Sequence, residues 1–291
     1  RASTAGDGAA FDAAVLPWRV QKVQRYSFQR PFTEAYRLCD GCNGWRTGSP
    51  DGFAVVECGV TEAKALIPRG IPLPDVTVRA PQNAVCRGTV KTGIAVKDCW
   101  RDRSLTDVGT KLKGYPEAAL DTAPSLMLQG TANGSVRPLG QPWQPGDRAI
   151  LGAQSFCILD FGINLSGFIR LAATCTARTQ LFLVFDEILV DGDVDWRRLS
   201  CVNVIAYELE PGTYELESFE PYTLRYLKVI VLDGACEVRD VSLREYAAAG
   251  MDRATFACSD PDVMRIFDAA RETCRQNATD VFMDCPSRER A

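Results

Sequence analysis

The chain has 291 residues, of which 46% are hydrophobic and 24% charged, with a formal net charge of -4 and no histidine. This composition is ordinary for a globular protein of about two domains. Because the basic residues are not clustered and no apolar run approaches about 18 residues, we expect neither a nucleic acid nor a membrane partner. The lack of histidine excludes Ser-His-Asp and Cys-His nucleophile systems from this chain, so any catalysis must use carboxylates.

Twelve cysteines are spread along the sequence. Several of them, such as Cys157, Cys175 and Cys274, lie inside apolar runs, where a free thiol behaves as a small hydrophobic side chain. We therefore predict mostly unpaired thiols in a cytoplasmic protein, because disulfides persist in oxidising compartments. Cys39 and Cys42 form a Cys-x-x-Cys pair, but no second pair completes the four ligands of a structural zinc site. We predict neither a metal nor a cofactor.

The N-terminal half has frequent chain breakers. Residues 1–15 are rich in Ala, Gly and Ser, and they predict a disordered leader. Over residues 16–145, Pro and Gly separate short Val-rich runs, which is typical of a β-rich domain. Asn133-Gly134 is a typical hairpin turn, and the Pro- and Gly-rich residues 140–146 predict a linker into the next domain.

Residues 146–250 have a stronger β signal. Phe156–Phe161, Phe168–Ala173 and Leu181–Phe185 are apolar runs of strand length, and the last is continuous enough to predict a central strand covered on both faces. Further strands follow as far as Leu243, and Asp-Gly turns separate some of them. The pattern predicts an antiparallel β-sandwich or jelly roll.

Within this region, Asp191, Asp193 and Asp195 alternate as they do in a calcium loop. Such a loop needs Gly at its sixth position and Glu at its twelfth, and those positions hold Trp196 and Val202. We therefore predict a hairpin turn with solvated acids. Trp196 and the two arginines after it, Arg197 and Arg198, suit a sugar ring and its hydroxyl groups, and ordinary packing of the indole is the alternative.

The last segment, residues 251–291, predicts one amphipathic helix. Ser259 or Asp260 can be the N-cap and Pro261 fits the first turn, after which Val263, Ile266 and Phe267 fall on one face. We expect the helix to end before Pro286. Its apolar face has no predicted helical partner upstream.

The chain closes with the run Asp284-Cys-Pro-Ser-Arg-Glu-Arg-Ala291. Two acids among guanidinium groups are what a sugar-cleaving site needs, because one acid must donate a proton while charged neighbours hold hydroxyl groups. A solvated charge run is the alternative.

This run resembles the signature that opens the catalytic helical barrel of bacterial α-L-rhamnosidases, glycoside hydrolase family 78. The segment from Asp160 to Tyr246 resembles the β-sandwich that precedes that barrel. The resemblance implies an inverting glycosidase in which Glu289 is the general acid and Asp284 and Arg288 hold the rhamnose ring. Many family members carry one more acidic residue between the Arg and the Glu, so the assignment of Glu289 assumes a one-residue gap.

The resulting prediction is a mainly β fold, with β-sandwich domains followed at 251–291 by the first helix of a truncated (α/α)6 barrel. The remaining barrel helices and the water-activating base are expected beyond Ala291. On this interpretation the full-length protein cleaves terminal α-L-rhamnose from a rhamnose-containing glycoside, while the present chain alone is inactive. The alternative is a non-catalytic carbohydrate-binding module whose sugar contacts come from Trp196.

Overall fold

The computed structural model of the chain describes part of the sequence. The described residues are 2–3, 10–11, 19–20, 26–29, 33–39, 54–55, 65, 68, 70–97, 125–198 and 202–279. The chain forms two compact units, one of residues 1–24 and 41–70 and one of residues 25–40 and 71–291. In the first unit, β1 (Ala2–Ser3) pairs with β2 (Ala10–Phe11), and β3 (Arg19–Val20) pairs with β6 (Ala54–Val55).

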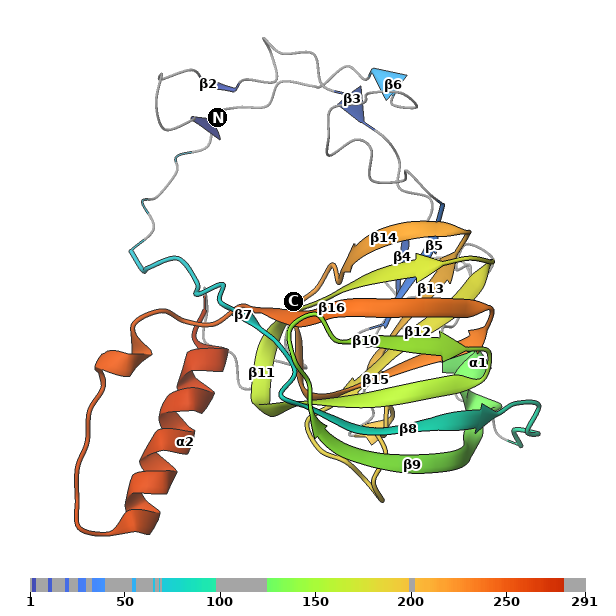
Figure 1. Ribbon diagram of the computed structural model, residues 1–291. Helices are drawn as coiled ribbons and strands as arrows, with labels where there is room; N and C mark the ends of the chain where they lie inside the picture. Colours follow the sequence, from blue (N-terminus) through green and yellow to red (C-terminus); the bar gives the residue numbers. More distant parts are fainter. Residues whose placement is uncertain are drawn as a thin grey trace. The chain divides into compact units, whose positions relative to one another are not determined.

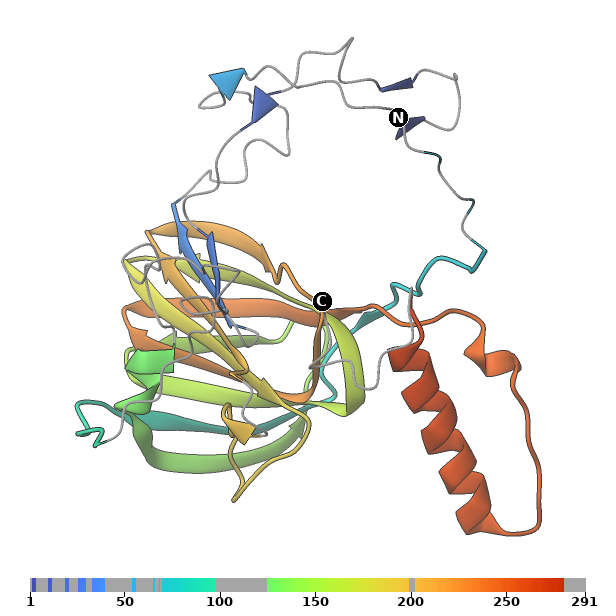
Figure 2. The same ribbon diagram turned by 180° about the vertical axis from the view of Figure 1, so that it is seen from behind.

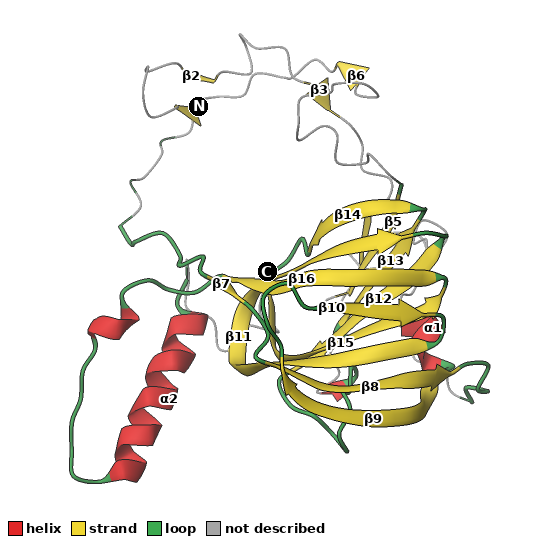
Figure 3. Ribbon diagram, in the orientation of Figure 1, coloured by secondary structure: helices red, strands yellow, loops and turns green. Residues whose placement is uncertain are grey.

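The second unit is a β-sandwich with a helix at its C-terminal end (Figures 1 and 3). Its strands are β4 (Tyr26–Gln29), β5 (Thr33–Leu38), β7 (Val78–Arg79), β8 (Asn83–Lys91), β9 (Ala132–Pro142), β10 (Arg148–Gly152), β11 (Ser155–Cys175), β12 (Thr179–Asp186), β13 (Val204–Leu209), β14 (Gly212–Glu217), β15 (Tyr222–Asp233) and β16 (Ala235–Glu245). The described α-helices are α1 (Ser125–Gln129) and α2 (Pro261–Asn277). Neither has the length and apolarity that a bilayer crossing requires. The mainly β fold class predicted from the sequence is confirmed.

One long strand, β11, joins the two layers. Its N-terminal half pairs with β8 and β15, and its C-terminal half pairs with β16 and β14. The bend between the halves falls at Gly162, which has a φ of 84° and donates its N–H to a carboxylate oxygen of Asp160 at 2.7 Å. A left-handed φ with a register shift is the geometry of a β-bulge, which bends a strand. The two apolar runs predicted as separate strands are therefore halves of one strand.

Strand β12 is central, as predicted. It pairs with β13 on one side and β15 on the other, and no residue of Leu181–Phe185 is more than 3% exposed. Leu183 and Phe185 belong to one face of the strand, whereas Phe182 and Val184 belong to a second apolar cluster with residues of β8, β15 and α1. Because both faces are covered, the run is apolar throughout instead of alternating.

One strand pair departs from the predicted antiparallel arrangement. β13 pairs with β5 in parallel, with Ile205 opposite Glu34 and Leu209 opposite Leu38. A parallel pair needs a long connection, and β5 comes from far upstream in the chain, so this requirement is met. The predicted antiparallel sandwich therefore gains one parallel pair at this edge, with a strand from the N-terminal part of the chain.

The turn predictions had mixed outcomes. Gly192 and Gly234 lie in turns, with φ values of 78° and 82°, as their Asp-Gly sequences predicted. Asn133 and Gly134 do not form a hairpin turn, because they lie inside β9, where Asn133 pairs with Val90 of β8. Figure 2 shows β8 and β9 from behind. These strands precede residue 145 and share the sheet of β11, and the domain boundaries at 15, 145 and 250 stay predictions.

Candidate functional site

Helix α2 leads directly to the predicted catalytic motif, and its start follows the capping pattern. The side chain of Asp260 accepts hydrogen bonds from the backbone N–H groups of Asp262 and Val263, at 2.8 and 3.4 Å. Pro261 takes the first turn, where its missing N–H costs nothing. The predicted helix is therefore present. The motif residues Asp284, Arg288 and Glu289 lie outside the described residues, and their roles stay predictions.

The end of α2 is fixed to the sandwich by a buried ion pair. Glu245, at the end of β16, is fully buried and accepts hydrogen bonds from the guanidinium of Arg275 in α2 and from Nε of Arg79 in β7, the latter at 3.3 Å. Arg275 also donates to Glu272 at 2.8 and 2.9 Å. The two carboxylates raise the pKa of Arg275, so the guanidinium stays charged and the junction remains an ion pair.

Gln276 adds a second, uncharged junction one residue later. It is 6% exposed, and its amide nitrogen donates to the backbone carbonyl of Asn164 at 2.9 Å and to Glu272 at 2.8 Å. Its amide oxygen accepts from the hydroxyl of Ser166 at 3.2 Å. A buried amide must satisfy both its donors and its acceptor, and these three partners do so for Gln276. The last turn of α2 is thus held against the bend of β11.

The apolar face of α2 is exposed in the described part of the chain. Val263 and Ile266 are 40% and 68% exposed, and Phe267 packs on Phe256 with ring centroids 5.2 Å apart. Figure 1 shows α2 standing beside the sandwich and attached near its C-terminal end. This arrangement leaves a helix face that other helices can cover.

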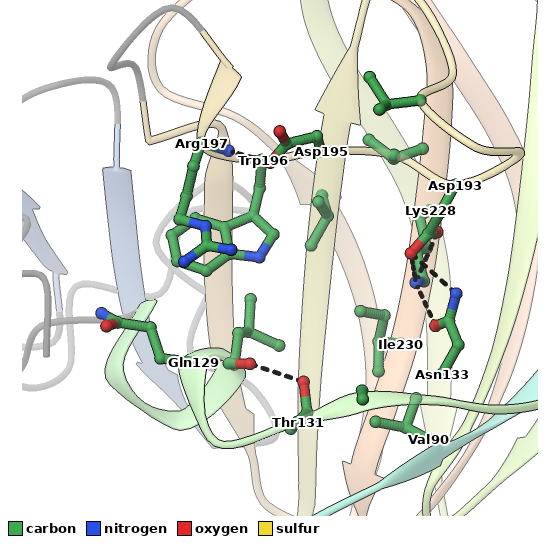
Figure 4. A pocket seen from close by; sticks show the side chains of 15 residues that line it. Val90, Gln129, Thr131, Asn133, Asp193, Asp195, Trp196, Arg197, Lys228 and Ile230 are labelled. Atoms are coloured by element: carbon green, nitrogen blue, oxygen red, sulfur yellow. Dashed lines mark hydrogen bonds and ion pairs between the residues drawn. The ribbon is translucent and has the colours of Figure 1, made fainter. Parts of the chain in front are cut away.

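A pocket of about 280 Å³ lies on the face of the sheet formed by β12 and β15 (Figure 4). The segment after β12 and helix α1 border it, and Trp196 lines it. The guanidinium of Arg197 lies 5.0 Å from the centroid of the Trp196 ring. The one predicted site residue within the described chain therefore contributes to a cavity, while its proposed contact with sugar stays a prediction.

Opposite Trp196, the pocket contains a buried ion pair that the sequence did not predict. Nζ of Lys228 donates to both carboxylate oxygens of Asp193, at 2.7 and 2.9 Å, and to the side-chain oxygen of Asn133 at 2.9 Å. Burial lowers the pKa of Lys228, against the raising effect of Asp193. Asp193 is thus an ion-pair partner and not simply a solvated acid. The signal in the sequence that could have predicted this ion pair is a lysine inside the apolar run of β15.

The segment beside the pocket is held at its base by a bidentate ion pair. Arg198 donates to the two oxygens of Asp186 at 2.6 and 2.7 Å and to Glu187 at 3.1 Å. The hydrogen bonds that Arg198 donates to Asp186 raise the pKa of the guanidinium. Glu187 in turn accepts from the amide of Asn164 at 3.1 Å. Asn164 thus links the segment beside the pocket to the end of α2, because its backbone carbonyl accepts from Gln276.

The predictions about thiols and metal sites can be compared with the structure at the described residues. The described cysteines are free, including the buried Cys157, whose pKa burial raises to about 12. Among the described residues, no group of three or more Cys, Asp or Glu side chains could hold a metal ion. Cys42 of the Cys-x-x-Cys pair lies outside the described residues.

Comparison with known protein families gives a match for the terminal segment. A family model described as the six-hairpin glycosidase domain of bacterial α-L-rhamnosidases matches residues 251–291. The chain is similar to the bacterial α-L-rhamnosidases. The resemblance noted in the sequence is thereby confirmed. No curated protein matches this rhamnosidase-like chain.

Solved rhamnosidase structures resemble the fold. The family 78 rhamnosidase of Bacillus sp. GL1 has a TM-score of 0.50 at 19% identity, and the match covers 60% of this chain and 20% of that chain. The rhamnosidase of Klebsiella oxytoca, solved with rhamnose bound, has a TM-score of 0.47 at 19% identity, over 75% of this chain and 38% of that chain. The rhamnosidase-like chain therefore spans about a fifth of the Bacillus enzyme.

Proposed function

We propose that the protein containing this chain is a glycoside hydrolase that removes terminal α-L-rhamnose from glycosides with inversion. The observation that supports this best is the rhamnosidase family model, whose match over residues 251–291 includes the motif with both acids. In this proposal Glu289 is the general acid, and Asp284 and Arg288 bind the hydroxyl groups of the rhamnose ring. Trp196 is a further candidate for sugar contact.

The proposed reaction needs two carboxylic groups on opposite sides of the sugar. Glu289 protonates the glycosidic oxygen as the bond to the anomeric carbon breaks, and a second carboxylate removes a proton from the attacking water. In inverting enzymes the two groups lie roughly 6.5 to 9.5 Å apart, which leaves room for that water. We place the second carboxylate in the barrel sequence that follows this chain in rhamnosidases.

The sandwich has a positioning role in this proposal. A general acid must be held in a defined geometry by supporting contacts on rigid elements. The contacts of Arg275 with Glu245, and of Gln276 with Ser166, fix the last turn of α2 against β11 and β16. In this proposal the sandwich supports the helix that precedes the motif in the sequence.

The test is the substitution Glu289→Gln in the intact enzyme. Gln keeps the shape of the side chain but has no proton to give, so hydrolysis of an aryl α-L-rhamnoside with a poor leaving group should fall by about 100-fold or more. A substrate with an activated leaving group needs the proton less, and its hydrolysis should fall by a smaller factor. Glu237→Gln, on β16 with a side chain 33% exposed, is the matched control and should keep the unmutated rate.

Two further variants separate binding from proton transfer. Asp284→Ala and Arg288→Ala should raise KM as well as lower kcat, because both side chains are assigned to the ground-state complex. If Glu289→Gln cleaves the poor substrate at the unmutated rate, Glu289 is not the acid. Binding of a rhamnoside without hydrolysis of either substrate would favour the non-catalytic carbohydrate-binding module instead.

A further inference from the structure

The pocket beside Trp196 has the size of a small ligand. Its volume of about 280 Å³ lies just below the range of roughly 300 to 1,000 Å³ that is usual for drug-sized molecules. The lining residues come from β8, β9, β12, β15, α1 and the segment that follows β12. A space of this size suits one six-membered ring.

The pocket combines an apolar floor with polar walls. Val90, Val184 and Ile230 contribute to the floor, while Figure 4 shows Arg197 and Trp196 on one side and Lys228 with its partners on the other. A ligand that fits must have one apolar surface and a polar edge. A pyranose ring has this character, because its axial C–H groups form an apolar patch and its hydroxyl groups radiate from the edge.

The charges of the described residues that line the pocket balance. Asp193 and Asp195 carry two negative charges, and Arg197 and Lys228 carry two positive charges. Phosphate and carboxylate ligands are bound where cations are in excess, as in arginine clusters. A balanced set offers no such excess, so the pocket favours an uncharged ligand.

Arg197 supplies hydrogen-bond donors that the described residues leave unused. Its guanidinium stacks on Trp196, and within the described part of the chain no carboxylate or carbonyl accepts a hydrogen bond from it. The backbone N–H of Arg197 donates to a carboxylate oxygen of Asp195 at 2.9 Å, which fixes the turn. A guanidinium that lies over an indole ring still has N–H groups from which hydroxyl oxygens can accept.

We propose that this pocket binds a single neutral 6-deoxyhexose ring of the glycoside substrate. The methyl group of such a sugar lies on Val184 and Ile230, and its hydroxyl groups accept from Arg197. The deoxyhexose identity rests on the proposed function, since a rhamnoside is the expected substrate. The neutral ring is supported independently by the size and charge of the pocket.

The test is a calorimetric titration of the chain with methyl α-L-rhamnoside. A ligand of so few atoms should bind with a Kd on the order of 1 mM. Arg197→Ala removes the donors, and Ala132→Phe fills the pocket from the exposed start of β9, so each should weaken binding by about tenfold or more. Arg148→Ala, on β10 with a side chain 63% exposed, makes the same change outside the pocket and should bind as the unmutated chain does. Circular dichroism confirms that each variant is folded.

Three results would overturn the proposal. They are the absence of binding at concentrations far above the expected Kd, binding that neither pocket variant weakens, and binding of D-glucuronate as tight as that of the rhamnoside. The last would mean that the pocket does not select for neutral ligands. Hydrolysis by the intact enzyme and by Glu289→Gln is measured separately. Pocket binding without hydrolysis would leave this proposal standing while the proposed function fails, and hydrolysis without pocket binding would do the reverse.

Discussion

The substitution Glu245→Ala tests how α2 is attached to the sandwich. The Glu245 side chain is fully buried, between Arg275, which is 16% exposed, and Arg79, which is 48% exposed. Removal of the carboxylate leaves the Arg275 guanidinium with Glu272 as its acidic partner among the described residues. The loss should therefore fall on the contact between helix and sheet and spare the helix itself.

The magnitude follows from these exposures. Removing one member of a buried ion pair costs about 3 to 5 kcal/mol, because the remaining charge is left without compensation. Glu272 compensates Arg275 in part, and the half-exposed Arg79 adds about 0 to 1 kcal/mol, as surface pairs do. We expect the free energy of unfolding to fall by about 2 to 4 kcal/mol.

Urea denaturation measures this free energy, and hydrogen exchange locates the loss. Amide protection should fall in α2 before it falls in β12, because Glu245 holds the helix and the core holds the strand. Glu215→Ala, whose side chain is 69% exposed, is the control and should change stability by less than about 0.5 kcal/mol. If Glu245→Ala matches this control, or if α2 keeps its protection, the ion pair does not attach the helix.

Other predictions concern the core, acid stability and the thiols. Phe185→Ala should lower the free energy of unfolding by about 3 to 5 kcal/mol, because Phe185 is 1% exposed and packs on Tyr222 with ring centroids 4.6 Å apart. In urea denaturation the control Ile150→Ala, at an exposed position of β10, should cost at most about 1 kcal/mol. Equal losses for the two variants would contradict the assigned core. Burial raises the pKa of Asp160, but hydrogen bonds from Arg225 and a backbone N–H outweigh it and the net pKa is lowered from 3.8. Its stabilising contribution is therefore present above pH 3.8 and is lost as the pH falls through the folded-state pKa, so Asp160→Asn should flatten the acid side of a stability–pH curve, and an unchanged curve would refute this. Mass analysis without reductant should find the described cysteines unpaired, and several disulfides would contradict the structure.

Runs of apolar residues predicted the strands better than Gly and Asn-Gly signals predicted where the strands end. Leu181–Phe185 was identifiable as central because five consecutive apolar residues leave no face for solvent. The sequence could not predict that β11 is one continuous strand, because a Gly at position 162 is typical of a strand end. Gly162 forms a bulge inside the strand only when the neighbouring strands are paired on either side of it. Asn133 was misinterpreted for a similar reason, because its contacts with Lys228 are distant in sequence.

The site was predictable to a different degree for each of its parts. The assignment of Glu289 rests on resemblance, since two acids among arginines have no unique meaning by themselves. Trp196 was singled out for its side chain, and it does line a pocket. The rest of that pocket could not be predicted, because Asn133 and Lys228 come together only through the pairing of β9 with β8 and of β15 with β11 and β12.

The pairing of β11 also determines when the sandwich can form during synthesis. Its C-terminal half lies between β14 and β16, and Gly167 is opposite Glu245, the last residue of β16. Strand pairs between segments so far apart in sequence form slowly, because the intervening chain must be ordered first. On the ribosome, one edge of the C-terminal half of β11 therefore stays unpaired until β16 has left the exit tunnel. Chaperone binding to the nascent chain should be greatest in that interval, before β16 pairs with β11.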